Sequence, residues 1–429
     1  MIFEYGRPQD KISLLIMVRP GLILASLLLV LLVANAGRLR TTASPQTFRM
    51  ILLLLVMAIH IPLAVNNGRA YLTTQTFFLY LIEFVSIIIF VDTIDRLRIF
   101  INWWIVLMVY LAINGIIGSG SAGSSFLLDE NDFALIMNMM LPFSVFLIFY
   151  EKKMKAKLLY LIASFSCIAS IVASFSRGGF VGLLVVAFVL WLTSPKKILV
   201  LSVSTILLFI VANLPITHVG TTSAGSTYWE EMNTIDSGDD YNKQSRLELW
   251  KAGWNMFIDH PLGVGPQNYP VRLPEYQSEY FERVMWGKAA HSIWFTLLPE
   301  LGIPGLLLFL SLFIANFRDV RYLSTMRKGE KDFQRFAYFL SLAFATSMAG
   351  YFAAGTFLSA LYYPHYWYLT AMIVAARKIV DRNDSSQIDS NYPPAEPLSL
   401  SKSRATRYGH LEKPGYELSK TGKAKNLRR

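Results

Sequence analysis

Apolar residues along this chain come in runs of about 20, separated by shorter polar connections. Each run is about as long as a helix needs to cross the ~30 Å hydrocarbon layer of a membrane. The windows lie near residues 14–36, 48–65, 71–91, 99–117, 133–150, 157–174, 179–194, 197–214, 292–317, 336–352 and 357–376. The pattern therefore predicts an all-α polytopic membrane protein with about 11–12 transmembrane helices.

Basic residues concentrate in alternate connections between these windows. The segments GRLRTTASPQTFR, EKKMKAK, SPKK and RDVRYLSTMRKGEKDFQR are all basic, and such connections are retained in the cytoplasm. The other connections, including SGSAGSSFLLDEND, SRGG, AAGT and a long loop at 215–291, then lie outside. An odd number of spans also places MIFEYGRPQD outside, so we expect either a further span upstream of Met1 or two merged spans.

Composition agrees with this class of protein, because 54% of the 429 residues are hydrophobic and only 16% are charged. The single cysteine, Cys167, excludes an intramolecular disulfide and argues against a thiolate metal site. We predict a transmembrane catalytic bundle over residues 1–376. Residues 377–429, rich in Ser, Pro and Lys, hold twelve basic and six acidic residues, and we predict a disordered cytoplasmic tail attracted to anionic lipid rather than to nucleic acid.

The loop at 215–291 is much longer than any other connection, and part of it has a helical pattern. In SRLELWKAGWNMFIDHPLGVG, the residues Leu247, Trp250, Trp254 and Phe257 recur at helical spacing. Ser245 is a suitable N-cap, and HPLGVG ends the pattern. We therefore predict a lid helix within this loop that lies on the membrane surface.

Arg177 stands in SFSRGGF, between two apolar windows. An arginine at mid-depth costs about 2.5–3.5 kcal/mol on insertion scales, and less near the interface. Arg177 either anchors the helix end by snorkelling or pairs with a buried anion. The predicted outer position, which basic residues avoid, and the adjacent glycines, which permit close approach of a ligand, favour the anion.

Four segments in this order resemble the O-antigen ligase and polymerase superfamily of membrane glycosyltransferases: DENDFALIMNMMLPFSVF, SFSRGGFVGLLVV, SRLELWKAGWNMFIDHPLGVGPQNY and AHSIWFTLLPELGIPG. The resemblance implies a GT-C-like fold and transfer of a glycan from an undecaprenyl-diphosphate carrier at the periplasmic face of the bacterial inner membrane, with no cofactor and no metal. It implies catalytic roles for Arg177, Arg246 and His291. Many members of the family carry His-Asn where this chain has His291-Ser292.

These residue types suit that chemistry on their own terms. Guanidinium groups are permanently charged, bidentate donors for phosphate oxygens, so Arg177 and Arg246 can hold the diphosphate in place of a divalent cation. The His291 imidazole, with an ordinary pKa near 6.5, can take the proton of the acceptor hydroxyl. Alternatively, His291 only donates hydrogen bonds to the diphosphate or the acceptor.

Other polar residues are interpreted structurally. The acidic group Asp129, Glu130 and Asp132 is a possible metal site, but Asn131 directly before an apolar window favours helix capping. His60 is interpreted as a packing residue and His365 as part of an aromatic belt at the interface. No role is assigned to His218 or His260.

The acceptor stays open among lipid A core in lipopolysaccharide, a second carrier-linked glycan in a polymerase, and a Ser or Thr hydroxyl in protein glycosylation. Two other classes of protein compete with a glycosyltransferase. A lipid-linked glycan flippase or transporter accounts for the spans but not for the single long loop. A structural scaffold accounts for neither Arg177 nor His291.

Overall fold

The computed structural model describes residues 2–18, 20–117, 127, 129–194, 196–213, 240–329 and 331–391. The chain divides into two compact units, Met1–Asp384 and Ser385–Arg429. Residues 377–391 of the predicted disordered tail are helical, because the last helix, Pro364–Asn391, continues through them. The rest of the tail and the first part of the predicted 215–291 loop lie outside the described residues, so disorder there stays a prediction.

The described residues form helices and no strands, which confirms the all-α class. In chain order the elements are η1 (Ile2–Gly6), α1 (Pro8–Lys11), α2 (Ser13–Val18), α3 (Pro20–Ala34), η2 (Ala36–Thr42), α4 (Pro45–His60), α5 (Asn67–Phe90), α6 (Ile94–Ile117), α7 (Glu130–Tyr150), α8 (Met154–Ala173), α9 (Arg177–Thr193), α10 (Lys197–Ala212), α13 (Asp240–Asp259), α14 (Tyr269–Tyr276), α15 (Trp294–Ser324), η4 (Thr325–Lys328), α16 (Asp332–Gly355), η5 (Ala360–Tyr362) and α17 (Pro364–Asn391).

Each of the eleven apolar windows coincides with a helix, but fewer of these helices meet both the length and the hydropathy expected of a membrane span. Within the part of the chain that the structure describes, α5, α6, α7, α8, α15 and α16 do so, and a seventh span results if α3 and η2, bent by 96°, are counted as one. The expected number of 11–12 is therefore too high by this measure. The apolar helices α4 and α9 have 16 and 17 residues and reach only ~24–26 Å, and α17 carries charges in its second half.

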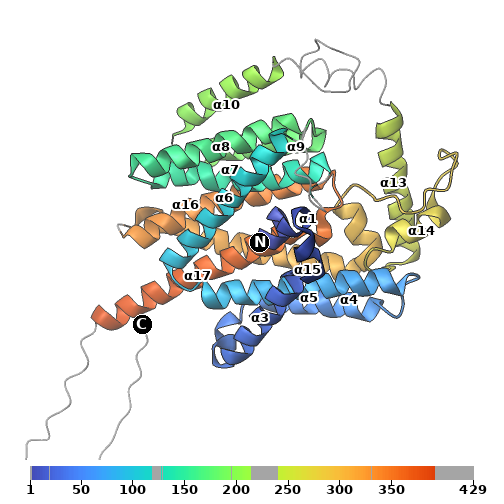
Figure 1. Cartoon of the computed structure of the whole chain (residues 1–429), viewed down its shortest axis with the longest axis horizontal. Coiled ribbons are helices and arrows are strands. Elements are labelled where there is room, and N and C mark those ends of the chain that lie inside the picture. Colours follow the sequence, from blue (N-terminus) through green and yellow to red (C-terminus); the bar gives the residue numbers. More distant parts are fainter. Residues whose placement is uncertain are drawn as a thin grey trace, which may run out of the picture. The chain divides into compact units, whose positions relative to one another are not determined.

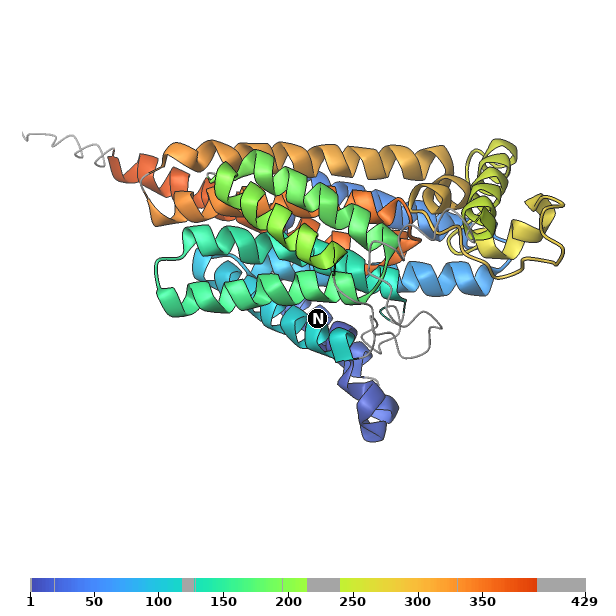
Figure 2. The same ribbon diagram turned by 90° about the horizontal axis from the view of Figure 1, so that it is seen from above.

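Helix α7 lies at the centre of the bundle. In its most apolar window 83% of the residues are buried, against 39% for α8, which faces outward. The run Phe133–Leu141 is buried on every side, as expected of a helix that is apolar all round. The long helix α16 runs alongside it, and α8 and α9 pack against it, whereas α15 packs against α16 and α4 (Figures 1 and 2).

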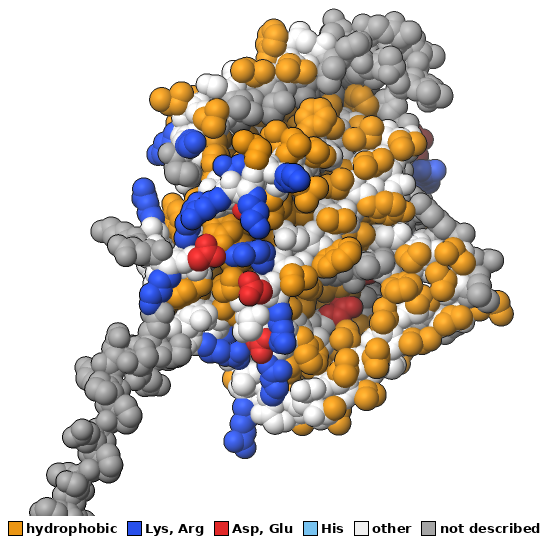
Figure 3. Space-filling view, turned by 60° about the vertical axis from the view of Figure 1, so that its left-hand side comes forward, with side chains coloured by type: hydrophobic (Ala, Val, Ile, Leu, Met, Phe, Trp, Pro, Cys, Tyr) orange, Lys and Arg blue, Asp and Glu red, His pale blue; other side chains and the backbone are white. Residues whose placement is uncertain are grey.

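The bundle has two different ends. One, here called the basic end, holds the α7–α8 turn, the end of α15 and the start of α16. Figure 3 shows Lys and Arg side chains gathered there, with Asp and Glu among them and hydrophobic side chains around them. Ion pairs such as Arg38–Asp92 (2.5 Å) and Arg98–Asp332 (3.2 Å) join neighbouring helices at this end.

The opposite end, here called the site end, holds the start of α9 and the α13–α14 module, residues 240–290 (Figures 1 and 2). The module has a small apolar core of its own, formed by Leu249, Ala252, Met256, Val264, Tyr269, Leu273, Phe281, Met285 and Ala290. In Figure 1, α13 runs across the direction of the bundle helices. A helix in this orientation lies parallel to the plane of a membrane that the bundle spans, as the lid prediction requires.

Candidate active site at the end of the bundle

The SFSRGGF turn joins α8 to α9 and presents Arg177 as the first residue of α9. Phe175 adopts a left-handed backbone (φ 49°), which turns the chain back sharply. Ser176 caps α9, since its Oγ accepts a hydrogen bond from the Gly179 N–H (2.9 Å) and donates to Asn131 Oδ1 (2.6 Å). This capped turn leaves the Arg177 side chain exposed at the site end.

Gly179 and Gly182 allow α9 to pack closely against α7. A Cβ on Gly179 would lie 2.4 Å from the Ala134 Cβ, and one on Gly182 would lie 2.8 Å from Asn138 Nδ2. Asn138 in turn donates to the Gly179 carbonyl (2.8 Å). Gly179 therefore brings α9 against α7 and so fixes where Arg177 emerges, whereas the role of these glycines in ligand approach stays a prediction.

Arg246 lies on α13, which is longer than predicted. The helix begins at Asp240 rather than after Ser245, so Ser245 is an interior residue and not the N-cap. Its buried face is formed by Leu249, Ala252 and Met256, whereas Trp254, part of the predicted stripe, is exposed. The predicted stop is confirmed, because α13 ends at Asp259.

His291 stands in the connection between the module and α15 and has a left-handed backbone (φ 49°). A non-glycine residue in this conformation is uncommon and needs support from its surroundings. Ser359 Oγ accepts the His291 N–H (2.9 Å), and the Gly355 carbonyl accepts the Ile293 N–H (3.0 Å). On the other side, Trp250 of α13 donates its Nε1–H to the Ala290 carbonyl (2.9 Å).

A buried carboxylate fixes the base of the α13–α14 module to the bundle. Glu300 on α15 is 1% exposed and accepts hydrogen bonds from the N–H groups of Gln267 (2.8 Å) and Tyr269 (3.2 Å) and from the Tyr362 hydroxyl (2.7 Å). Glu300 was not among the predicted site residues, although an acidic residue within the apolar run LLPELGIPG is a recognisable signal.

Arg177, Arg246 and His291 come together on one cavity of ≈ 640 Å³. Its lining residues come from α7, the α8–α9 turn, α13 and the segments around His291 and Phe357: Glu130, Asn131, Phe175, Ser176, Arg177, Gly178, Val181, Ser245, Arg246, Leu247, Leu249, Trp250, Lys288, His291 and Phe357. The cavity joins cationic groups to an apolar wall, a combination suited to a lipid-linked anion. Lys288, which the sequence analysis did not single out, adds a third cation.

The half-buried His291 is held in its neutral form. Burial lowers its pKa below the ordinary 6.5, and the nearby charges of Arg246 and Lys288 lower it further, while Asp129 acts in the opposite direction. A neutral imidazole accepts a proton, so His291 is suited to act as a general base near neutral pH.

The acidic residues before α7 have separate roles. Asp129 is the N-cap, since its carboxylate accepts the Asn131 N–H (2.8 Å), and Asn131 lies inside the first turn instead of capping it. Asp132 is buried and accepts a hydrogen bond from the Tyr363 hydroxyl (2.9 Å). Among the described residues, no group of three His, Cys, Asp or Glu is arranged to hold a metal ion.

Two other histidines lie within the bundle and have structural partners. His60 has the Val56 and Leu262 carbonyls at 2.7 and 2.9 Å from its ring nitrogens, which agrees with a packing role. His365 is fully buried beside the Tyr5 hydroxyl (2.7 Å), so it does not belong to an interfacial belt. His218 lies outside the described residues.

The fold and this cavity define a multi-span membrane protein with a cationic, partly apolar site at one end of its bundle. Residues 159–310 match the O-antigen ligase family, so over this segment the chain is similar to an O-antigen ligase domain. The matched segment includes Arg177, Arg246 and His291. No curated protein matches the chain.

Proposed function

We propose that this protein transfers a glycan from an undecaprenyl-diphosphate carrier to an acceptor hydroxyl at the periplasmic face of the bacterial inner membrane. The observation that carries the proposal is the convergence of Arg177, Arg246 and His291 on one cavity. These residues come from three elements far apart in the sequence, so chance proximity along the chain does not account for their meeting.

On the donor side, the leaving group is a lipid diphosphate. Arg177 and Arg246 offer paired N–H donors to its oxygens, and Lys288 adds a compact positive charge at the same cavity. As the bond between the anomeric carbon and the phosphate oxygen breaks, its electron pair stays on the diphosphate. Fixed cations stabilise that charge without a metal ion.

On the acceptor side, a hydroxyl attacks the anomeric carbon and gives its proton to the neutral His291 imidazole. The new bond joins the acceptor oxygen to the sugar, and the carrier diphosphate leaves. The acceptor is lipid A core in a ligase, a second carrier-linked glycan in a polymerase, or a Ser or Thr side chain in a protein glycosyltransferase.

The test is transfer by the purified protein in lipid nanodiscs. The donor is undecaprenyl diphosphate carrying an oligosaccharide, and the three acceptor types are supplied separately in the presence of excess chelator. We expect transfer to one acceptor type, unaffected by the chelator. Absence of transfer to all three contradicts the proposal, and loss of activity that magnesium or manganese restores contradicts the metal-free mechanism.

Variants separate a diphosphate clamp from a helix anchor. Arg177→Lys keeps the charge but loses the bidentate donors, so it should be nearly as inactive as Arg177→Ala. Arg283→Ala, an exposed change in the same module and outside the cavity, is the matched control and should transfer normally. Near-normal transfer by Arg177→Lys at equal protein level would exclude the clamp.

A further inference from the structure

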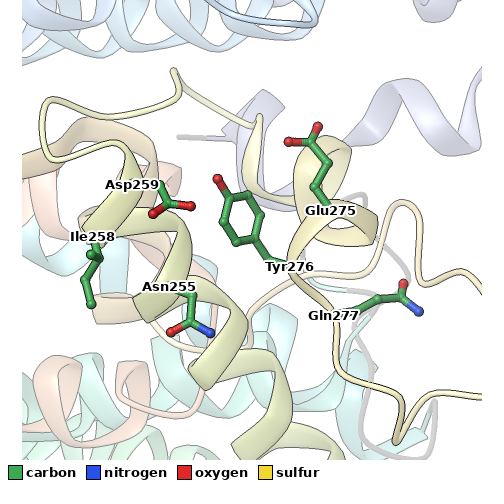
Figure 4. A pocket seen from close by; sticks show the side chains of 6 residues that line it. All are labelled: Asn255, Ile258, Asp259, Glu275, Tyr276 and Gln277. Carbon is green, nitrogen blue, oxygen red and sulfur yellow. The ribbon is translucent and has the colours of Figure 1, made fainter.

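A second pocket, of ≈ 430 Å³, lies between α13 and α14, outside the cavity that holds Arg177. Its volume is within the range of small-ligand sites. Asn255, Ile258 and Asp259 of α13 and Glu275, Tyr276 and Gln277 at the end of α14 line it (Figure 4). The diphosphate chemistry above uses none of these residues.

The lining has the chemistry of a sugar site rather than of a phosphate site. It holds two carboxylates, two amides, a phenol and one aliphatic side chain, and no cation. Carboxylates accept hydrogen bonds from sugar hydroxyls, and amides both donate and accept them. Aromatic and aliphatic side chains pack against the C–H faces of sugar rings. Figure 4 shows the Asp259 carboxylate and the Tyr276 hydroxyl facing each other across the gap, with Asn255 about one turn along α13.

Bonds within the module fix the α14 side of the pocket. Glu275 pairs with Arg272 (2.7 Å), which also contacts His260 Nε2 (2.6 Å), and Gln277 Oε1 accepts the Met285 N–H (2.7 Å). These contacts hold Tyr276 opposite α13. The side chains best placed to bind a ligand are therefore Asn255, Asp259 and Tyr276.

The pocket and the diphosphate site share one rigid helix. Asn255 and Asp259 lie nine and thirteen residues beyond Arg246 on α13, which corresponds to ~14 and ~20 Å along the helix axis and to roughly the opposite side of the helix, so a bound glycan passes around α13 to reach the pocket. When the diphosphate of the donor is bound at Arg246, the sugar chain attached to that diphosphate extends away from Arg246. We propose that this pocket binds a sugar residue of the donor glycan, several sugars away from the reacting bond; the proposal rests on the proposed function.

The kinetic test compares two donors: undecaprenyl diphosphate carrying an oligosaccharide, and the same carrier with a single N-acetylglucosamine, which is too short to reach the pocket. Asn255→Ala with Asp259→Ala should raise KM about tenfold for the long donor, a typical loss for a few hydrogen bonds, and leave the short donor unchanged. Tyr276→Phe, which keeps the ring, should give a smaller rise. Glu282→Ala, exposed and outside the pocket, is the control.

Equal effects on the two donors, or none on the long one, would overturn the proposal. If the wild-type protein transfers neither donor, the proposed function fails, and the pocket is then tested by titration calorimetry with the lipid-free oligosaccharide released from the long donor. Binding by the wild-type protein that the double variant lacks supports the pocket. No binding, or equal binding by a correctly folded double variant, refutes it.

Discussion

At the scale of residues, the protonation state of His291 is set by its neighbours. Because its pKa is lowered, the imidazole is neutral at pH 7 and becomes protonated only as the pH falls through that lowered value. Transfer that needs a neutral base should therefore be constant above pH 6.5 and decline only at lower pH.

Changes of nearby charge should move this decline in opposite directions. Lys288→Gln removes a positive charge, so the pKa of His291 rises and the decline moves to higher pH. Asp129→Asn removes a negative charge, keeps the capping ability of the residue, and should move the decline to lower pH. Screening by solvent and salt keeps each shift below about 1 pH unit. Initial rates between pH 5 and 8 measure the effect, and shifts of the same sign would contradict it.

Ser359 is predicted to position His291 through its backbone. Ser359→Ala leaves the His291 N–H without its acceptor, and a small displacement of a catalytic group can lower kcat by up to about 10²-fold. KM for the donor should stay constant because the cationic groups are unchanged. Ser359→Thr, which retains the hydroxyl, should recover activity in steady-state kinetics. A melting temperature equal to that of the wild-type protein checks that Ser359→Ala is folded, and a rise in KM with kcat unchanged would contradict the positioning role.

How far the sequence predicts the site depends on the kind of residue. Arg177, Arg246 and His291 stand in segments that resemble a family, and the structure places all three on one cavity. Lys288 and Ser359 stand in no such segment. Ser359 matters because the fold brings it to His291, which is 68 positions away, and no local sequence pattern predicts that contact.

At the scale of elements, the kink in α15 is where the α13–α14 module packs against the bundle. Gly302 has φ 60°, and a Cβ there would lie 2.3 Å from the Leu262 carbonyl carbon. Gly302→Ala should therefore displace the loop after α13 and lower thermal stability, by ~2–4 °C for each kcal/mol lost. Gly68→Ala, whose Cβ would make only an ordinary 3.5 Å contact, is the control. Equal melting temperatures for the two variants would contradict this role.

Helices were easier to predict than their ends. Apolar windows located the long helices of the bundle among the described residues, because hydrophobic length alone predicts a membrane helix. Helix α13 was predicted instead from the helical spacing of its apolar residues. The start of α13 was misplaced by six residues, since Ser245 has the chemistry of a cap but Glu248 and Leu249 beside it are buried in the module. Which face of α13 is buried depends on Tyr269, Leu273 and Phe281, which pack on it from later in the chain.

At the scale of the whole molecule, the two ends of the bundle differ in charge, and this difference predicts how the protein is oriented. Basic connections are retained in the cytoplasm, so the basic end should face inward and the α13–α14 module outward. Cysteine labelling measures this directly. The buried native Cys167 is first replaced by alanine, and single cysteines are introduced at Glu282 in the module or at Lys155 near the α7–α8 turn, both exposed.

In intact cells, or in spheroplasts where an outer membrane is present, an impermeant maleimide should label the Glu282→Cys variant at once. It should label Lys155→Cys only after the membrane is permeabilised, and that second step also serves as the accessibility control for this position. The reverse pattern would place His291 and the two arginines in the cytoplasm. The proposed reaction with a periplasmic donor would then be impossible, because that donor's diphosphate and glycan would lie on the other side of the membrane from the groups that must bind them.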